Sequence, residues 1–165
     1  MGTGGLFLRK LRARVASEPT GFVWVEEGKL AGSGYPASRS QVEWLTSSGI
    51  RSILTLTPEP LPPKWTAGLE LTVGHVAMED HEAPSVGAMT EGVRFITDQL
   101  RLGSPVVVHC LAGEGRTGCV LAAFLITERH MDGEEAIKAL RRVKPRFVEH
   151  AQEKSVYEYA RGMKL

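Results

Sequence analysis

Short apolar runs rich in β-branched residues recur along the chain and predict its strands. Glycines, prolines and polar residues separate these runs from one another. Strands are predicted over residues 22–25, 29–31, 50–56, 69–77 and 105–109. The last of them reads PVVVH, a continuous apolar run of the kind that forms a strand covered on both faces.

Helical spacing of apolar positions lies between these strands. Met89, Val93, Ile96 and Leu100 recur at intervals of three and four, which predicts a helix with one buried face over residues 88–101. Strands that alternate with helices are typical of an α/β sheet. We therefore predict a single α/β domain with a central, mostly parallel sheet flanked by helices.

Turn and cap signals divide the rest of the chain. An earlier helix is predicted to start at a cap formed by Ser38 or Ser40 and to end at Gly49. The stretch PEPLPPKW, residues 58–65, predicts a proline-rich loop, and residues 78–87 predict a polar loop. Neither stretch has the length or the flanks of a linker between domains.

Composition and charge narrow the class of protein. The 165 residues, 42% hydrophobic and 24% charged, suffice for one domain with a full core. Twenty basic against nineteen acidic side chains give a net charge of +1, which favours neither nucleic acid nor membrane as a general partner. No apolar run approaches the roughly eighteen residues of a membrane span, and the N-terminus lacks a signal-peptide pattern. We expect a soluble cytoplasmic protein with no nucleic-acid partner and no transmembrane segment.

Residues 106–124 hold the clearest chemical signal. A buried strand runs into Cys110, a loop of small residues and then a helical pattern, so backbone N–H groups at the helix N-terminus form an anion site. Gly113, Gly115 and Gly118 allow tight turns and a close approach of the main chain to a ligand. A thiol in this field is expected to ionise at neutral pH. Arg116 adds a planar charged fork that suits two phosphate oxygens.

Less specific interpretations of this stretch are weaker. A structural role for Cys110 leaves the arginine six residues later unexplained. A nucleotide-binding P-loop requires a lysine that GEGRTGC lacks, and a rhodanese-like sulfurtransferase fits the Thr117-Gly118 pair less well. The second cysteine, Cys119, lies among apolar residues and is predicted to be core, with a redox role as the minor alternative. Two cysteines without a histidine cluster indicate neither a disulfide framework nor a metal site, and we expect no cofactor.

HCLAGEGRTG, residues 109–118, resembles the H-C-x-x-G-x-x-R-T-G signature of the cysteine-dependent protein tyrosine phosphatases at every fixed position. The rest of residues 21–160 is similar to the small atypical dual-specificity phosphatases, archaeal-type or short single-domain enzymes. The resemblance implies the cysteine phosphatase fold and a metal-independent hydrolysis in which Cys110 becomes phosphorylated. It implies that the following residues of the signature loop, defined here as residues 110–116, bind the phosphate: Leu111, Ala112, Gly113, Glu114, Gly115 and Arg116.

The resemblance also assigns supporting roles around the signature loop. Asp80, in a polar loop thirty residues before Cys110, is expected to be the general acid, with Glu79 and Glu82 as alternatives. Thr117 is expected to help the sulfur leave in the second step, and His109 to orient the loop by hydrogen bonding.

Two polar residues near the C-terminus are candidates for holding the water of that second step. Family members place such a residue on a loop near the last helix, and KPRFVEHAQEK supplies Glu149 and Gln152. Because they are three apart, they are expected to share a face on the first turn of a helix. The structural alternative is that Glu149 interacts with the helix N-terminus and Gln152 is solvated.

The expected substrates are phosphoproteins or phosphopeptides. Phosphotyrosine is favoured because an aromatic leaving group demands less of the acid, with phosphoserine and phosphothreonine as further candidates. Glu114 in the signature loop is expected to disfavour highly charged inositol lipids. The alternative function is a phosphate-binding scaffold, a pseudophosphatase on the same fold.

Residues 1–20 precede the part of the chain that carries the resemblance, so the catalytic domain is placed at 21–165. Within the basic extension, residues 6–15 combine cationic side chains with apolar residues at helical spacing. One interpretation is an extension that frays or packs on the core. The other is weak binding to an anionic surface or a partner.

Overall fold

The structure, a computed structural model, describes residues 18–164, so the predicted basic extension falls almost entirely outside the described residues. The strands are β1 (Val23–Glu26), β2 (Leu30–Ser33), β3 (Ser52–Thr55), β4 (Thr72–His75) and β5 (Val106–His109). The α-helices are α2 (Arg39–Ser47), α3 (Pro63–Thr66), α4 (Val86–Arg101), α5 (Gly115–Arg129), α6 (Gly133–Val143) and α7 (Glu153–Met163). A 3₁₀ turn, η1 (His150–Gln152), leads into α7.

The strands form one five-stranded sheet in the order β1-β2-β5-β3-β4. β2, β5, β3 and β4 are parallel, and only β1 runs antiparallel to its neighbour β2. β5 lies in the centre, where Val108 is in register with Gly32 on one side and Leu54 on the other. Ligands of open parallel sheets bind at the carboxyl ends of the strands, so the position after β5 is the expected place for a site.

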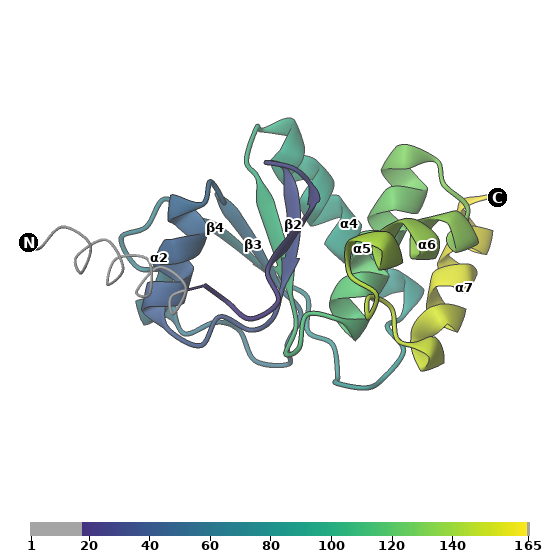
Figure 1. The fold of residues 1–165 in the computed structure, drawn as a ribbon, viewed down its shortest axis with the longest axis horizontal. Coiled ribbons are helices and arrows are strands. Elements are labelled where there is room, and N and C mark those ends of the chain that lie inside the picture. Colours follow the sequence, from purple (N-terminus) through teal and green to yellow (C-terminus); the bar gives the residue numbers. More distant parts are fainter. Residues whose placement is uncertain (1–17, 165) are drawn as a thin grey trace, which may run out of the picture.

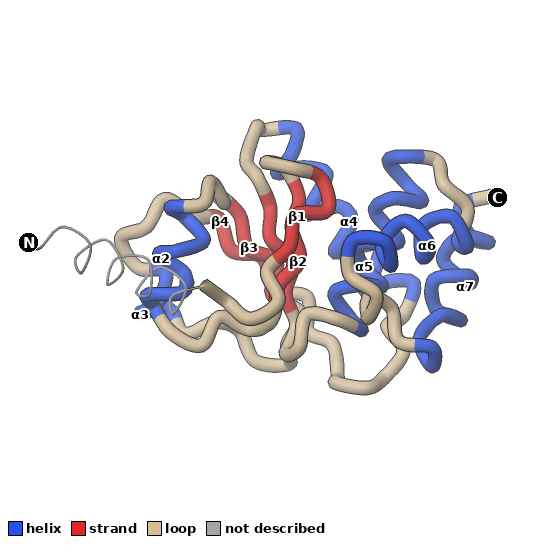
Figure 2. Tube along the Cα trace, viewed as in Figure 1, coloured by secondary structure: helices blue, strands red, loops and turns tan. Residues whose placement is uncertain are grey.

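Helices cover both faces of the sheet. Figure 1 shows α2 on one side and α4, α5, α6 and α7 on the other, and in Figure 2 the short α3 lies beside α2. The side chains of β5 pack on both faces of the sheet. Val106 and Val108 belong to the core cluster beneath α4–α7, and Val107 belongs to the cluster beneath α2. The predicted single α/β domain with a mostly parallel sheet is confirmed.

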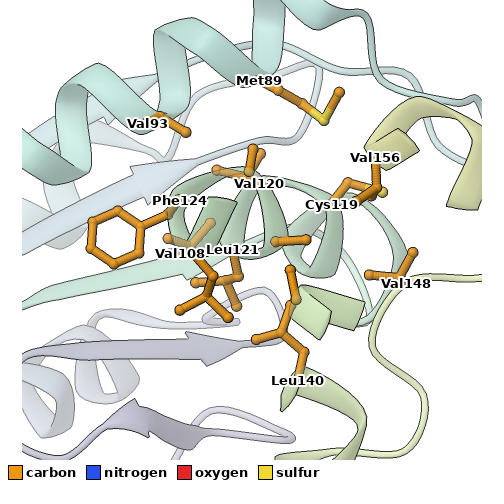
Figure 3. Packing of buried hydrophobic residues seen from close by; sticks show 14 of the residues in the cluster. Met89, Val93, Val108, Cys119, Val120, Leu121, Phe124, Leu140, Val148 and Val156 are labelled. Atoms are coloured by element: carbon orange, nitrogen blue, oxygen red, sulfur yellow. The ribbon is translucent and has the colours of Figure 1, made fainter. Parts of the chain in front are cut away.

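α5 is the central helix of the larger layer. Its residues from Gly115 through Ile126 are all buried, as expected for a helix that is apolar on all sides. Figure 3 shows Val120 and Leu121 of α5 among side chains from α4, α6 and β5. This packing fixes the N-terminus of α5 against the end of β5.

The observed elements refine several sequence predictions. Ser38 caps α2 by accepting a hydrogen bond from the N–H of Gln41, which decides between the two serine candidates. The predicted loop at 58–65 contains the one-turn helix α3, which begins at a proline because the first helical position needs no N–H donor. The strand predicted over 69–77 spans only Thr72–His75 and is partly exposed, since it lies at the sheet edge. Within residues 18–164, no helix has both the length and the apolar character needed to cross a bilayer.

Candidate active site

The signature loop connects the carboxyl end of β5 to the first turn of α5. Cys110 is 2% exposed, and its Sγ accepts a hydrogen bond of 3.3 Å from the N–H of Gly113. The N-cap residue of α5, Glu114, makes no side-chain cap hydrogen bond. The N–H groups of the first helical turn therefore keep their capacity to bind an anion.

Glycine is required at two positions of this turn. Gly113 has φ of +72°, and a Cβ there would lie 2.3 Å from the backbone of Ser33. A Cβ at Gly118 would lie 2.4 Å from the backbone nitrogen of Val148. The loop is therefore pressed against β2 on one side and against the segment before α7 on the other.

His109 makes hydrogen bonds on both sides at the start of the loop. Its Nδ1–H donates to the carbonyl of Cys110 at 3.1 Å, and its Nε2 accepts from the Thr55 hydroxyl at 2.9 Å. His109 is fully buried, and this burial, reinforced by the positive charge of Arg116, lowers its pKa to about 4. The imidazole is therefore neutral at physiological pH, as one donated and one accepted hydrogen bond require.

Arg116, the last residue of the signature loop, forms an ion pair with Asp80. The Arg116 side chain is 2% exposed, and it donates from Nη1 to the carbonyl of Met78 at 2.9 Å. Its Nη2 lies 3.0 Å from Oδ1 of Asp80. Asp80 is also held by His81, whose backbone N–H donates to Oδ1 at 2.9 Å. The carboxylate predicted as the acid and the guanidinium predicted as the clamp are thus direct neighbours.

The alternative acids have different surroundings. Glu79, Asp80 and Glu82 are all exposed, but among them only Asp80 is shown in an ion pair with Arg116. The backbone carbonyl of Glu82, and not its carboxylate, takes part in the site by accepting a 3.0 Å hydrogen bond from Nε2 of Gln152. Of the three acidic side chains in this loop, the geometry favours Asp80.

Gln152 and Glu149 do not share a helical face, because α7 begins only at Glu153. Glu149 instead precedes the 3₁₀ turn as its N-cap and is partly exposed. Gln152 is 1% exposed, and its Oε1 lies 2.4 Å from where a Cβ at Gly115 would be. The predicted solvated alternative for Gln152 is therefore wrong, because the side chain is packed between the acid loop and the first turn of α5.

A pocket of about 340 Å³ lies beside the signature loop. Its lining includes Glu114, Arg146 and Glu149. Nε of Arg146 lies 3.4 Å from Oε2 of Glu114. This ion pair offsets the negative charge at Glu114, which weakens the charge argument against inositol lipids.

Thr117 and Cys119 occupy the first turns of α5. Thr117 is fully buried, and its Oγ1 has no hydrogen-bond partner among the described residues. A buried hydroxyl without a partner is unusual, and this one lies one residue after Arg116. Cys119 is also fully buried, and this burial raises its pKa to about 12. It is a core residue, as predicted.

The sequence did not point to four contributors to the site. Thr55 contacts it through His109, His81 contacts it through its neighbour Asp80, and Lys144 contacts it through the carbonyl of Gly113. Arg141 holds the segment before α7 by donating to the carbonyls of Phe147 and Val148. Only the proline after Lys144, which ends α6, gave a local signal that the chain turns back there.

A buried thiol that accepts a backbone N–H hydrogen bond, with a buried arginine six residues later paired to a carboxylate, is the arrangement expected of a cysteine-dependent phosphatase. Residues 19–157 match the family described as "Swiss Army Knife protein, DSP-PTPase phosphatase domain". The chain belongs to this phosphatase family, as the signature predicted.

Curated proteins that are similar in sequence to this chain are also phosphatases. The chain is 32% identical over 129 residues to phosphatidylglycerophosphate phosphatase PTPMT2 of Arabidopsis thaliana, covering 74% of this chain and 56% of that protein. It is 30% identical over 112 residues to human dual specificity protein phosphatase 9, covering 67% of this chain and 29% of that protein. The match to this chain thus spans slightly more than half of the first of these proteins and less than a third of the second.

Solved structures share the fold. The crystal structure of Tk-PTP in the active form superposes with a TM-score of 0.75 at 28% identity, covering 85% of this chain and 96% of that one. The cysteine phosphatase fold predicted from the sequence is therefore confirmed.

Proposed function

We propose that this protein hydrolyses phosphomonoesters through a phosphorylated Cys110. The observations that carry the proposal are the hydrogen bond from the Gly113 N–H to the Cys110 sulfur and the ion pair of Asp80 with Arg116, the last residue of the same loop. These groups are a nucleophile, an anion clamp and a proton donor on one side of the sheet.

In the first step the Cys110 thiolate attacks phosphorus, so an S–P bond forms as the P–O bond to the leaving group breaks. The N–H groups of the signature loop and the guanidinium of Arg116 hold the equatorial oxygens. The bound phosphate competes with Asp80 for the guanidinium of Arg116. Asp80 then gives its proton to the leaving oxygen, which departs as an alcohol or phenol.

In the second step water attacks phosphorus and passes a proton to the Asp80 carboxylate left by the first step, while the S–P bond breaks to release inorganic phosphate and the Cys110 thiolate. Thr117 supports this step, since its unpartnered hydroxyl is free to donate to the sulfur as negative charge returns to it. Gln152 and Glu149 remain the two candidates for holding the water. Gln152 has the better position, because it is buried against Gly115 at the base of the loop.

Phosphotyrosine on a protein is the first candidate substrate. The variable positions of the signature loop carry no lysine or arginine for extra phosphates, and Leu111 presents an apolar side chain, 59% exposed, next to Cys110. An apolar surface beside the nucleophile suits an aromatic leaving group. Phosphoserine and phosphothreonine are further candidates, as the similarity to a dual specificity phosphatase supports.

A phosphorylated glycerolipid is the second candidate substrate. The Arabidopsis thaliana relatives are named as phosphatidylglycerophosphate phosphatases. The ion pair between Arg146 and Glu114 supplies a cation at the rim of the site that a second acidic group of a lipid headgroup can use. The cytoplasmic location predicted from the sequence stays a prediction.

Two assays test the proposal. Hydrolysis of para-nitrophenyl phosphate without added metal separates an enzyme from a phosphate-binding scaffold, since a scaffold binds vanadate and gives no turnover. A panel of phosphotyrosine, phosphoserine and phosphothreonine peptides with a short-chain phosphatidylglycerophosphate then ranks the substrates by kcat/KM. A higher kcat/KM for the lipid than for every peptide would reject the protein-phosphatase assignment.

A further inference from the structure

The N–H groups of the signature loop point inward only if its carbonyl groups point outward, because the C=O and N–H of a trans peptide face opposite ways. Each outward carbonyl needs a hydrogen-bond donor behind the loop. His109 supplies one to Cys110, and the backbone N–H of Tyr35 supplies another to Leu111 at 2.9 Å. The carbonyl of Glu114 accepts from the N–H of Gly118 at 3.0 Å.

The carbonyl of Gly113 receives its hydrogen bond from a charged side chain. Nζ of Lys144 lies 3.0 Å from this oxygen and 3.4 Å from the carbonyl oxygen of Gly21. The ammonium also sits 5.4 Å from the centre of the Phe147 ring. Three contacts thus hold one partly buried lysine behind the loop.

The fold fixes the place of this lysine. Lys144 is the C-cap residue of α6, and its backbone N–H still donates to the carbonyl of Leu140. Pro145 then turns the chain away from the helix. The side chain therefore starts from a rigid helix end rather than from a loose loop.

The electrostatics agree with the geometry. Burial lowers the pKa of the Lys144 ammonium, whereas the negative charges of Glu114 and of the Cys110 thiolate oppose that effect. The other charged or titratable groups around the loop are Arg116, Asp80, Arg146, His109 and Cys119. Lys144 thus brings a cation to the outer side of the loop, opposite the side that binds the substrate.

We propose that Lys144 is a positioning residue that holds the Gly113–Glu114 peptide with its carbonyl outward and the Glu114 N–H directed at the phosphate. Gly113 makes this clamp necessary, since a glycine at positive φ leaves the adjacent peptide plane free to rotate. A rotated Gly113–Glu114 peptide would turn its carbonyl oxygen toward the anion in place of its N–H. The attraction between the N–H and the anion would then be replaced by repulsion from the carbonyl oxygen. The proposal rests on the phosphate-binding part of the proposed function and not on turnover.

The experiment compares Lys144→Met with the wild-type protein, using tungstate as the probe of the empty anion site. Methionine keeps an unbranched apolar stem over Phe147 and removes the donor and the charge. The tungstate dissociation constant, measured by calorimetry, is expected to rise about tenfold or more, the range of a lost hydrogen bond to a charged group. Tungstate affinity within twofold of wild type would overturn the proposal.

A matched control separates this effect from a general loss of charge or stability. Lys138→Met removes a lysine from the exposed face of the same helix, where its only described ion pair is to Glu134, and should leave tungstate binding unchanged. Equal loss in both variants would also overturn the proposal.

If Lys144→Met fails to fold, Lys144→Arg tests the proposal in its place. It keeps donor and charge, so binding within threefold of wild type supports the clamp and a tenfold loss rejects it. A wild-type protein that binds tungstate without hydrolysing any phosphomonoester would reject the proposed function and leave the role of Lys144 standing.

Discussion

At the scale of single residues, the anion site and the nucleophile are separable parts. The sulfur of Cys110 accepts from the N–H of Gly113, but the N–H ring is built from the main chain and from Arg116. Replacing Cys110→Ser therefore removes the nucleophile and keeps the cradle. We expect turnover of para-nitrophenyl phosphate to fall about 10³-fold or more, with tungstate affinity in calorimetry close to wild type. Residual activity near the wild-type rate would show that Cys110 is not the nucleophile.

The proposed general acid, Asp80, can also be removed without removing the proposed anion site. Asp80→Asn keeps the shape of the side chain beside Arg116 and removes the transferable proton. The expected result is a kcat about 10²-fold lower on substrates with poor leaving groups, with a flattened basic limb of the pH profile. Steady-state rates on a series of substituted phenyl phosphates measure both effects. Glu79→Gln and Glu82→Gln are the controls, and a larger loss in either would move the acid to that position.

The residue scale also shows where sequence reasoning ends. Cys110 and Arg116 were predictable because the seven residues of the signature loop carry the whole pattern. The contact of Lys144 with Gly113 spans 31 positions and that of Thr55 with His109 spans 54. Nothing local in KP or SILT marks such contacts, since they arise only when the strands and helices pack.

At the scale of elements, the signature loop depends on how closely β2 approaches it. Gly113 has positive φ, and a Cβ there would lie 2.3 Å from the Ser33 backbone, so Gly113→Ala strains the turn and pushes the loop away from β2. We expect a loss of about 2 kcal/mol or more in the free energy of unfolding by urea and a loss of tungstate binding. Gly28→Ala is the matched control, because its φ is +69° but no atom lies within 4 Å of the added Cβ. Equal destabilisation by both variants would show that backbone strain, and not the contact with β2, dominates.

A second element-scale prediction concerns the junction of the acid loop, α5 and the 3₁₀ turn before α7. Gln152 reaches both the carbonyl of Glu82 and the base of α5. If it holds the attacking water, Gln152→Ala leaves the burst of phenol intact in rapid-quench experiments and slows the steady state. Glu149→Ala tests the other candidate under the same conditions. Wild-type steady-state rates in both variants would exclude both residues from this role.

Elements themselves were predicted well where periodicity was strong and poorly where it was not. The helix predicted over 88–101 is observed as Val86–Arg101, with Ser85 as its cap. The strand at 69–77 was overestimated, because a short edge strand has no apolar pattern of its own to limit it. The separation of Glu149 from Gln152 followed from the 3₁₀ turn, which no spacing rule revealed.

At the scale of the whole molecule, His109 couples the stability of the fold to pH. It lies at the end of the central strand, and burial lowers its pKa to about 4 from 6.5, with Arg116 and His75 adding to the effect. The unfolded chain therefore binds a proton below about pH 6.5 that the folded chain does not bind until about pH 4, so stability is full above pH 6.5 and falls with the pH. Between pH 6.5 and 5 we expect the free energy of unfolding to decrease by about 1.5 kcal/mol from this group. Glu153, whose pKa is lowered chiefly by its hydrogen bond from Arg141, loses its contribution only below that window.

Urea unfolding at closely spaced pH values measures this slope. His109→Asn keeps a polar side chain that can hydrogen-bond near Thr55 and removes the titration, so the variant should be less stable at pH 7 and much less sensitive to pH between 6.5 and 5. Because the same imidazole orients the carbonyl of Cys110, the variant should also bind tungstate more weakly at neutral pH. An equal pH slope in wild type and variant would show that the uptake of protons on unfolding in this range belongs to other groups.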